Sequence, residues 1–353
     1  MQKPKKWMTP NVNKCKIIRR LAMAFLYSEF SKLRISRGVS QDELAELSGV
    51  KASRIKNYEC GRRRAHLEDV VLMCQALNVK VDDYYKKECF TICFLSNKGG
   101  SSKSTSSVNV AFTLANEYNK KVLLIDSDMQ QNASQHLNID INDEKNFYIA
   151  FSEKQSLTDH ILKTEYDNID VVTSHDGMSM IETEMASMEL REFRMKQILK
   201  PVLDKGEYDF IIIDTNPSLG QLNRSILYAS DSVIIPLEAS AFGLRGLEFL
   251  TRFIDGVKDN YSNLNILGIL VNKFDLRKRV PKDVVEMVET RFGHRDLLFK
   301  TKIMTDSAIE QAQMMGEPVG VSFPKSRANL GFITLCDEII KRSEKVVRSG
   351  ERL

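Results

Sequence analysis

Residues 89–105, CFTICFLSNKGGSSKST, join an apolar run to a glycine-containing loop that ends in a lysine and two hydroxyls. Apolar residues then recur at helical spacing between positions 108 and 115. A strand, a loop and a helix in this order can bind phosphate, because backbone N–H groups and the helix N-terminus face the anion. The usual pattern G-x-x-x-x-G-K-[ST] is not met, since Asn97 and Ser102 stand at its glycine positions. The segment is therefore a chance turn, a damaged phosphate loop or a working variant.

Two later segments favour a working variant. KKVLLIDSDMQQNAS places Asp126 and Asp128 after a buried strand, and YDFIIIDTNPSLG places Asp214 after another. Carboxylates at the C-terminal ends of parallel strands lie where an α/β sheet builds its site. There they can hold the shell of a Mg²⁺ ion or orient a water molecule. The three segments predict an α/β fold, with a parallel-sheet P-loop NTPase core.

A helix-turn-helix pattern precedes this core. In GVSQDELAELSGVKASRIKNYE, Ser40 and Glu43 form an S-x-x-E capping box, and Gly49 permits a tight turn. We expect Leu44, Ala45 and Leu47 on the buried face of the first helix, and Val50, Ile55 and Tyr58 on that of the second. Upstream, apolar spacing between residues 15 and 26 predicts another helix after a basic arm. The predicted domains are 1–26 (basic arm and helix), 27–87 (small all-α helix-turn-helix domain) and 88–353 (ATPase domain).

Charge is unevenly distributed along the chain. Residues 1–88 hold 19 Lys/Arg and 10 Asp/Glu, although the whole chain has a formal net charge of only +4. A basic N-terminal piece on a mildly acidic body suggests a polyanionic partner, but a solvated basic surface is an equal alternative. The six cysteines form no C-x-x-C pair and no zinc spacing, which fits a reducing cytosol.

The pattern Q-x-x-x-A-x-x-x-G-V-x-x-x-x-I-x-x-Y-E, from Gln41 to Glu59, resembles the Cro/C1-repressor (XRE) class of DNA-binding domains. The resemblance implies that the second helix enters the major groove. The alternative is a helical bundle used for dimerisation. The residues that the resemblance assigns to DNA, on that helix, at the start of the preceding one and just after it, are Gln41, Lys51, Ala52, Ser53, Arg54, Lys56, Asn57, Arg62 and Arg63.

From about residue 89 to 345 the chain resembles the ParA/MinD/Soj group of deviant Walker ATPases. The resemblance rests on KGGSSKS, VLLIDSDMQQNAS, the strand with its NPSLG turn, ASDSVIIPLEASAFGLRGLEFL and ILVNKFD. The group's loop carries an additional lysine before its two glycines, here Lys98. The cofactors implied are ATP and Mg²⁺.

The resemblance also implies roles for single residues. Lys98 would cross an ATP-sandwiched homodimer to the partner's nucleotide, Lys103 would bind the outer phosphates, and Asp128 would position the attacking water. Ser104, Asp126 and Asp214 would hold Mg²⁺. The residues expected to contact the nucleotide are Lys98, Gly99, Gly100, Ser101, Ser102, Lys103, Ser104, Thr105 and, at the base, Asn272.

The chain departs from the group's pattern at the first switch, where DMQQNA replaces D-P-Q-G-N-A. It also has DTNP where D-x-P-P is common. These changes put the hydrolysis rate in question. Ser102 matches the K-G-G-V-S-K-T loop of plasmid-partition members that carry an N-terminal DNA-binding domain, whereas Ser101 has no explanation.

The function that we expect is ATP-dependent DNA partition by a slow, Mg²⁺-dependent ATPase. The ATP-bound dimer would bind DNA non-specifically, a ParB-type centromere-binding partner would stimulate hydrolysis, and the N-terminal domain would bind operator DNA for autoregulation. Candidate non-specific contacts are Arg277, Lys278, Arg279, Lys282, Lys341, Arg342, Lys345 and Arg348. The expected location is cytoplasmic, on the nucleoid. The alternatives are a nucleotide-sensing repressor with little hydrolysis and a MinD-like membrane ATPase, which the weakly apolar C-terminal tail disfavours.

Overall fold

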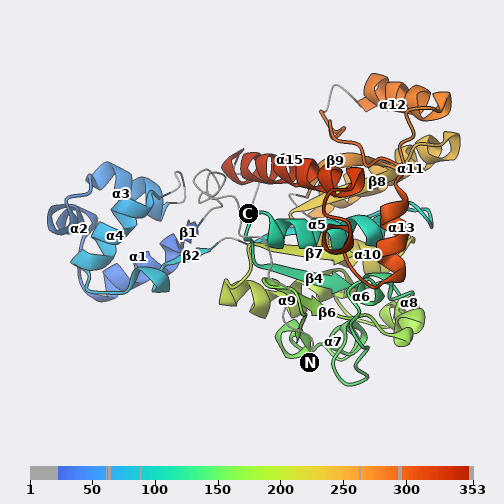
Figure 1. The fold of residues 1–353 in the computed structure, drawn as a ribbon. Coiled ribbons are helices and arrows are strands. Elements are labelled where there is room, and N and C mark those ends of the chain that lie inside the picture. Colours follow the sequence, from blue (N-terminus) through green and yellow to red (C-terminus); the bar gives the residue numbers. More distant parts are fainter. Residues whose placement is uncertain are drawn as a thin grey trace, which may run out of the picture. The chain divides into compact units, whose positions relative to one another are not determined.

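A computed structural model describes residues 23–60, 62, 65–87, 89–261, 264–292 and 296–349. These residues form two compact units, one within 20–88 and one that starts at Cys89 (Figure 1). Within the described residues, no helix combines the length and apolar character that a bilayer crossing requires.

The smaller unit is a helical domain closed by a short two-stranded sheet. Its strands are antiparallel, with Met23 opposite Lys87. Its elements are β1 (Met23–Phe25), α1 (Tyr27–Ser36), α2 (Gln41–Ser48), α3 (Ala52–Glu59), α4 (Leu67–Ala76), η1 (Val81–Asp83) and β2 (Tyr85–Lys87).

The local features predicted for this unit are present. Ser40 Oγ accepts from the Glu43 backbone N–H at 3.1 Å, and Glu43 Oε2 accepts from the Ser40 N–H at 2.7 Å. Such a cap is worth on the order of 1 kcal/mol. Gly49 ends α2 with φ 72°, a left-handed conformation that glycine adopts without strain.

Two predictions for this unit are wrong. Leu47 is 63% exposed, whereas Leu44, Val50, Ile55 and Tyr58 are buried as expected. No helix runs through residues 23–26, because β1 pairs there with β2; residues 15–22 of the predicted helix lie outside the described residues. The predicted domain boundaries remain a prediction.

The larger unit is built on a sheet that has seven strands within the described residues, in the order β5-β6-β4-β7-β3-β8-β9. All neighbours are parallel except β5 and β6. The strands are β3 (Phe90–Phe94), β4 (Val122–Asp126), β5 (Leu162–Lys163), β6 (Ile169–Val172), β7 (Phe210–Asp214), β8 (Ser232–Glu238) and β9 (Asn265–Asn272).

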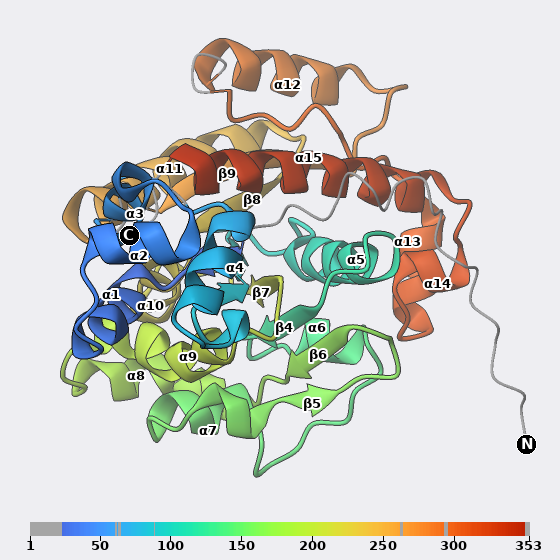
Figure 2. The same cartoon turned by 90° about the vertical axis from the view of Figure 1, so that its left-hand side faces the viewer.

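Helices cover both faces of this sheet, so the central strands are buried at every position. On one face α5 packs against α15 and the sheet; on the other, alternate strand residues join the core of α9, α10 and α11 (Figures 1 and 2). The helices are α5 (Lys103–Asn116), α6 (Asn132–Gln135), α7 (Phe147–Ser152), α8 (Ile181–Ala186), α9 (Arg194–Lys205), α10 (Gln221–Tyr228), α11 (Ala241–Tyr261), α12 (Arg279–Phe292), α13 (Ser307–Met314), α14 (Val319–Ser322) and α15 (Arg327–Ser349). Short 3-10 turns are η2 (Leu157–His160), η3 (Asp176–Met180) and η4 (Arg191–Phe193).

The register brings the predicted carboxylates together. Asp126 at the end of β4 lies opposite Asp214 at the end of β7, and Phe94 of β3 lies opposite Asp214 on its other side. The loop that follows β3 therefore begins beside both acids.

Candidate nucleotide-binding site

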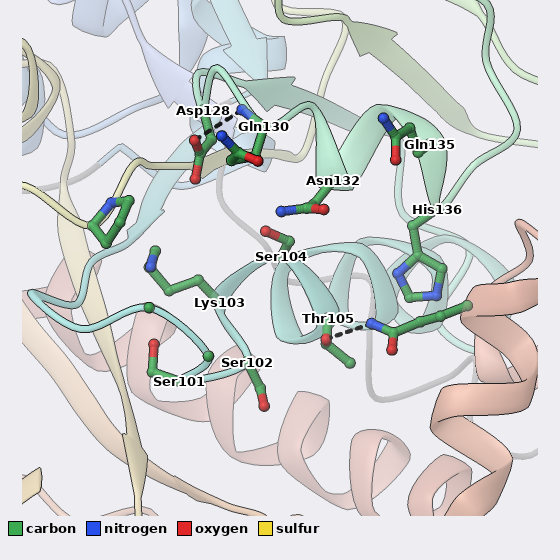
Figure 3. A pocket seen from close by; sticks show the side chains of 14 residues that line it. Ser101, Ser102, Lys103, Ser104, Thr105, Asp128, Gln130, Asn132, Gln135 and His136 are labelled. Atoms are coloured by element: carbon green, nitrogen blue, oxygen red, sulfur yellow. Dashed lines mark hydrogen bonds between the residues drawn. The ribbon is translucent and has the colours of Figure 1, made fainter.

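A cavity of about 530 Å³ lies at this edge of the sheet, in the size range of small-molecule sites. The loop from Gly99 to Thr105 forms one wall, and the segment after β4 forms another (Figure 3). Gly100 has φ 74° and Ser102 has φ 66°, so both lie in the left-handed region. The serine at the usual glycine position thus keeps the conformation that glycine would adopt, at a cost on the order of 1 kcal/mol.

Lys103 and Ser104 open helix α5 inside this cavity. The Lys103 Nζ donates to the carbonyl of Lys98 at 3.5 Å, and the lysine is only 6% exposed. Burial lowers the pKa of Lys103, while the nearby Asp214 and Asp128 carboxylates raise it. A buried cation at a helix N-terminus can bind the phosphates of a nucleotide.

The two carboxylates predicted to hold Mg²⁺ are both fully buried but differ in their partners. Asp126 accepts hydrogen bonds from the Ser134 backbone N–H, the Ser134 hydroxyl and the Asp128 N–H. Among the described residues, no hydrogen bond of good geometry reaches either oxygen of Asp214, although the Ser104 hydroxyl lies close enough to lower its pKa. Burial raises the pKa of both groups; for Asp214 the neighbouring Asp126 adds to the shift, while Ser104 and Lys103 oppose it.

The residues present fit a Mg²⁺ ion. The Asp214 carboxylate, which lies beside Ser104, supplies hard oxygen ligands. Burying such a charged group without a nearby cation costs free energy. In the described part of the chain, no three His, Cys, Asp or Glu side chains gather around a common metal position. This also fits Mg²⁺, which is usually bound by one or two carboxylates together with substrate phosphates and water.

Asp128 stands at one side of the cavity, in the first switch (Figure 3). It is 5% exposed, and one carboxylate oxygen accepts from the Gln130 N–H at 3.1 Å. Burial raises its pKa, against the effects of the Gln130 N–H and the Lys103 charge. Gln131, at the position where the family pattern has glycine, has φ 56°, and its amide donates to Asp176 at 2.6 Å. These hydrogen bonds therefore fix the first switch, the DMQQNA segment, in the conformation seen here.

Lys98 does not line the cavity. Its ammonium group pairs with Glu238 Oε2 at 2.9 Å, on the neighbouring strand β8, and its side chain is 46% exposed. A lysine that points away from its own site is compatible with the predicted contact to a partner's nucleotide.

Asn272 lies outside the cavity lining and is 2% exposed. Its amide donates to the carbonyl of Ser101 at 3.3 Å and to Ser106 Oγ at 3.1 Å. It therefore holds the phosphate loop. Asp126 and Asp214 are also absent from the cavity lining, and the predicted contact of Asn272 with a base stays a prediction. Ser101 contributes this backbone carbonyl, while its buried hydroxyl has no partner among the described residues.

Three residues that line the cavity are not predicted from the sequence. Gln135 and His136, at the end of α6 and directly after it, and Gln313 of α13 face the site from positions far apart in the chain. None of them belongs to a motif, and no sequence signal marks them.

The DNA-binding prediction concerns helix α3. Lys51, Ser53, Lys56 and Arg62 are exposed, Ala52 and Asn57 are partly exposed, and Arg63 lies outside the described residues. Lys51 is the N-cap of α3 and forms no side-chain cap. Arg54 pairs with Asp69 at 2.8 Å, so its charge is already engaged within the domain.

Two further residues predicted to contact DNA have partners within their own unit. The Gln41 amide donates to Glu59 at 2.7 Å, and Arg34 pairs with the same carboxylate. Arg342 donates to the carbonyls of Leu267, Asp296 and Leu298 and lies over the Phe299 ring. The guanidinium of Arg342 thus joins α15 to β9 and to the segment 296–298, and this engagement disfavours it as a DNA contact. The side chain of Arg348 is outside the described part.

Two family models match the chain. An AAA domain model matches residues 89–267, and a helix-turn-helix model matches residues 31–84.

Characterised relatives match the larger part of the chain. The chromosome partitioning protein ParA of Myxococcus xanthus is 34% identical over 253 residues, which cover 71% of this chain and 88% of the relative. The sporulation initiation inhibitor protein Soj of Bacillus subtilis is 35% identical over 250 residues, covering 70% of this chain and 97% of Soj.

Solved structures share the fold. A plasmid partition protein of Borrelia burgdorferi B31, bound to AMPPNP, has a TM-score of 0.60 and 25% identity over 73% of this chain and 99% of that one. A variant of Cyanothece McdA in complex with ATP has a TM-score of 0.64 over 72% of this chain and 97% of that one; at 21% identity it shows the fold alone. The chain therefore belongs to the ParA/MinD/Soj family of P-loop ATPases and carries a helix-turn-helix domain ahead of the ATPase domain.

Proposed function

We propose that the protein is a DNA partition ATPase that binds ATP with Mg²⁺ in the cavity after β3. The observation that carries the proposal is the arrangement of the loop 99–105 around one buried cation, Lys103, with Asp126 and Asp214 at the paired ends of β4 and β7 and Asp128 just after β4. The relatives named as partition proteins support it.

Each group has a distinct task in this proposal. The loop N–H groups and Lys103 bind the phosphates, while Ser104 and Asp214 hold the metal. Bound Mg²⁺ would neutralise phosphate charge. Asp128 orients the attacking water, and the burial of Lys103 and Asp128 strengthens these electrostatic contacts. Lys98 acts in the second site of an ATP-bound homodimer.

The DNA contacts belong to two surfaces. Helix α3, with Lys51, Ser53 and Lys56 exposed, binds operator DNA for autoregulation. The exposed cations Arg277, Lys278, Arg279 and Lys282 bind DNA without sequence preference in the dimer. Arg277 and Arg279 exchange their ion pairs with Asp275 and Asp283 for phosphate contacts. A ParB-type partner stimulates hydrolysis on the nucleoid, in the cytoplasm.

The experiment is a paired measurement on the full chain. Lys103→Ala should lose ATP binding, whereas Asp128→Ala should keep ATP binding and lower turnover by about 100-fold or more. Micromolar ATP binding by Lys103→Ala would refute the loop assignment, and unchanged turnover in Asp128→Ala would remove Asp128 from the reaction.

A second candidate function is a nucleotide-sensing repressor with little hydrolysis. Gln131, in a left-handed conformation and bonded to Asp176, favours it because it immobilises the switch that carries Asp128. ATPase assays with and without DNA and a centromere-binding partner separate the two. Background activity under every condition, with nucleotide-dependent operator binding, would favour the repressor.

A further inference from the structure

The cavity has two chemically different sides. Asp128 and Lys103 lie toward one side, and His136 and Thr105 toward the other (Figure 3). Among the described residues that line it, Lys103 is the only Lys or Arg. The side formed by Thr105, Gln135, His136 and Gln313, here called the His136 end, offers only neutral hydrogen-bonding groups.

The His136 end is not needed for phosphate binding. The loop, Lys103 and Ser104 already surround the position of the phosphates, and Asp128 marks where the terminal phosphate meets water. The cavity of about 530 Å³ nevertheless continues past Thr105. Neutral donors and acceptors in this continuation suit the sugar and base of a nucleotide, which carry no charge.

His136 is the first residue poised for this contact. It is 4% exposed, and neither ring nitrogen has a hydrogen-bond partner among the described residues. Burial lowers the pKa of the ring to about 4, although a weak hydrogen bond toward the backbone of Glu317 favours the charged form. The ring is thus neutral at physiological pH, with one donor and one acceptor. The Glu317 backbone can engage only the donor, and weakly, so the buried acceptor is left without a partner, which is costly.

Gln313 is the second residue placed for a contact with the sugar or base. Its amide donates to Thr105 Oγ1 at 2.8 Å, which links helix α13 to the start of α5 across the cavity. The residue is exposed, so its amide can turn from Thr105 to a ligand without disturbing the core. An amide that offers a donor beside an acceptor matches the edge of adenine.

We infer that His136 and Gln313 recognise the nucleoside part of the nucleotide. This inference rests on the proposed function, because it assigns a further part of the same site.

The experiment compares ATP with inorganic triphosphate, which has the phosphates but no nucleoside. Binding of each is measured by calorimetry, with Mg²⁺, on the full-length wild type, Gln313→Ala and His136→Phe. Gln311→Ala, an exposed glutamine on the same helix that does not line the cavity, is the matched control.

The expected result is an affinity for ATP that falls about 5- to 20-fold in each variant, with triphosphate affinity changed less than about 2-fold. Gln311→Ala should behave as wild type for both ligands. Equal losses for ATP and triphosphate, or no loss in the exposed Gln313→Ala variant, would overturn the inference. A wild-type protein that binds neither ligand would instead refute the proposed function.

Discussion

At the scale of single residues, the site shows how burial determines the protonation state of a side chain. His136 stays neutral because its burial penalises the charged form of the ring. Asp214, which no hydrogen bond of good geometry reaches among the described residues, lies beside a second carboxylate, an arrangement that a cation would relieve. Ser102 shows that a serine can hold the left-handed conformation of a phosphate-loop glycine.

The depressed pKa of His136 predicts a pH dependence of stability. The folded value is about 4 and the ordinary value is 6.5, so the folded protein binds this proton less readily than the unfolded chain. The stabilisation is present above pH 6.5 and is lost as pH falls toward 4, by up to about 3 kcal/mol. Urea denaturation of wild type and His136→Phe should show a smaller loss in the variant over this window. Parallel curves for the two proteins would show that His136 does not titrate as inferred.

At the scale of elements, helix α10 depends on a cap from another helix. Glu182 of α8 accepts from the N–H groups of Gln221 at 2.9 Å and Leu222 at 3.2 Å, at the N-terminus of α10. This helix begins directly after the loop that follows Asp214, so the cap also anchors that loop. A Cβ at Gly220 would clash with the Glu182 carboxylate, so the cap in this position requires a residue without a side chain there.

Removal of this cap should destabilise the protein. Glu182→Ala leaves two helix N–H groups without their carboxylate, at an expected cost of about 1–2 kcal/mol in the free energy of unfolding. Glu189→Ala, an exposed glutamate a few residues later in the chain, should cost less than about 0.5 kcal/mol. Chemical denaturation measures both. Equal effects would mean that the contact to α10 contributes nothing.

The sequence predicts elements whose signals are local. Strands β3, β4 and β7 are apolar runs that end near glycine or aspartate, and the Ser40–Glu43 cap spans four residues, so the sequence alone identifies them. The helix expected over residues 15–26 fails at 23–26 because β1 forms only by pairing with β2, about sixty residues later. His136 and Gln313 escape sequence reasoning because tertiary packing alone brings the end of α6 and α13 to one cavity.

At the scale of the whole molecule, the position of Lys98 bears on dimer formation. In a single chain its ammonium group is held by Glu238, while the proposed dimer needs it in the partner's site. Forming the dimer must therefore break this ion pair. Exposed pairs of this kind are worth about 0.2–1 kcal/mol.

Weakening the pair should favour the dimer. Because both chains of the dimer break this pair, Glu238→Gln should tighten ATP-dependent dimerisation by about 2- to 30-fold, measured by light scattering or sedimentation. In a Lys98→Ala background the same change should have no effect, which makes the two substitutions a double-mutant cycle. Glu207→Gln, which weakens the exposed pair with Lys121, serves as control. The same tightening with and without Lys98 would contradict the coupling.

A substitution that removes DNA binding by one unit should leave ATP binding by the other unit unchanged, and the reverse. Lys56 is exposed on α3 and Lys103 is buried in the nucleotide site of the other unit. Lys56→Ala should weaken binding to a DNA duplex selected by the wild-type protein from a random library, by about 5- to 30-fold, and leave ATP binding unchanged. Lys32→Ala, which removes an exposed lysine on α1, is the control for charge. Lys103→Ala should lose ATP binding yet keep specific DNA binding when nucleotide is absent. If Lys103→Ala alone abolished specific DNA binding without nucleotide, the helix-turn-helix domain would not recognise its operator independently.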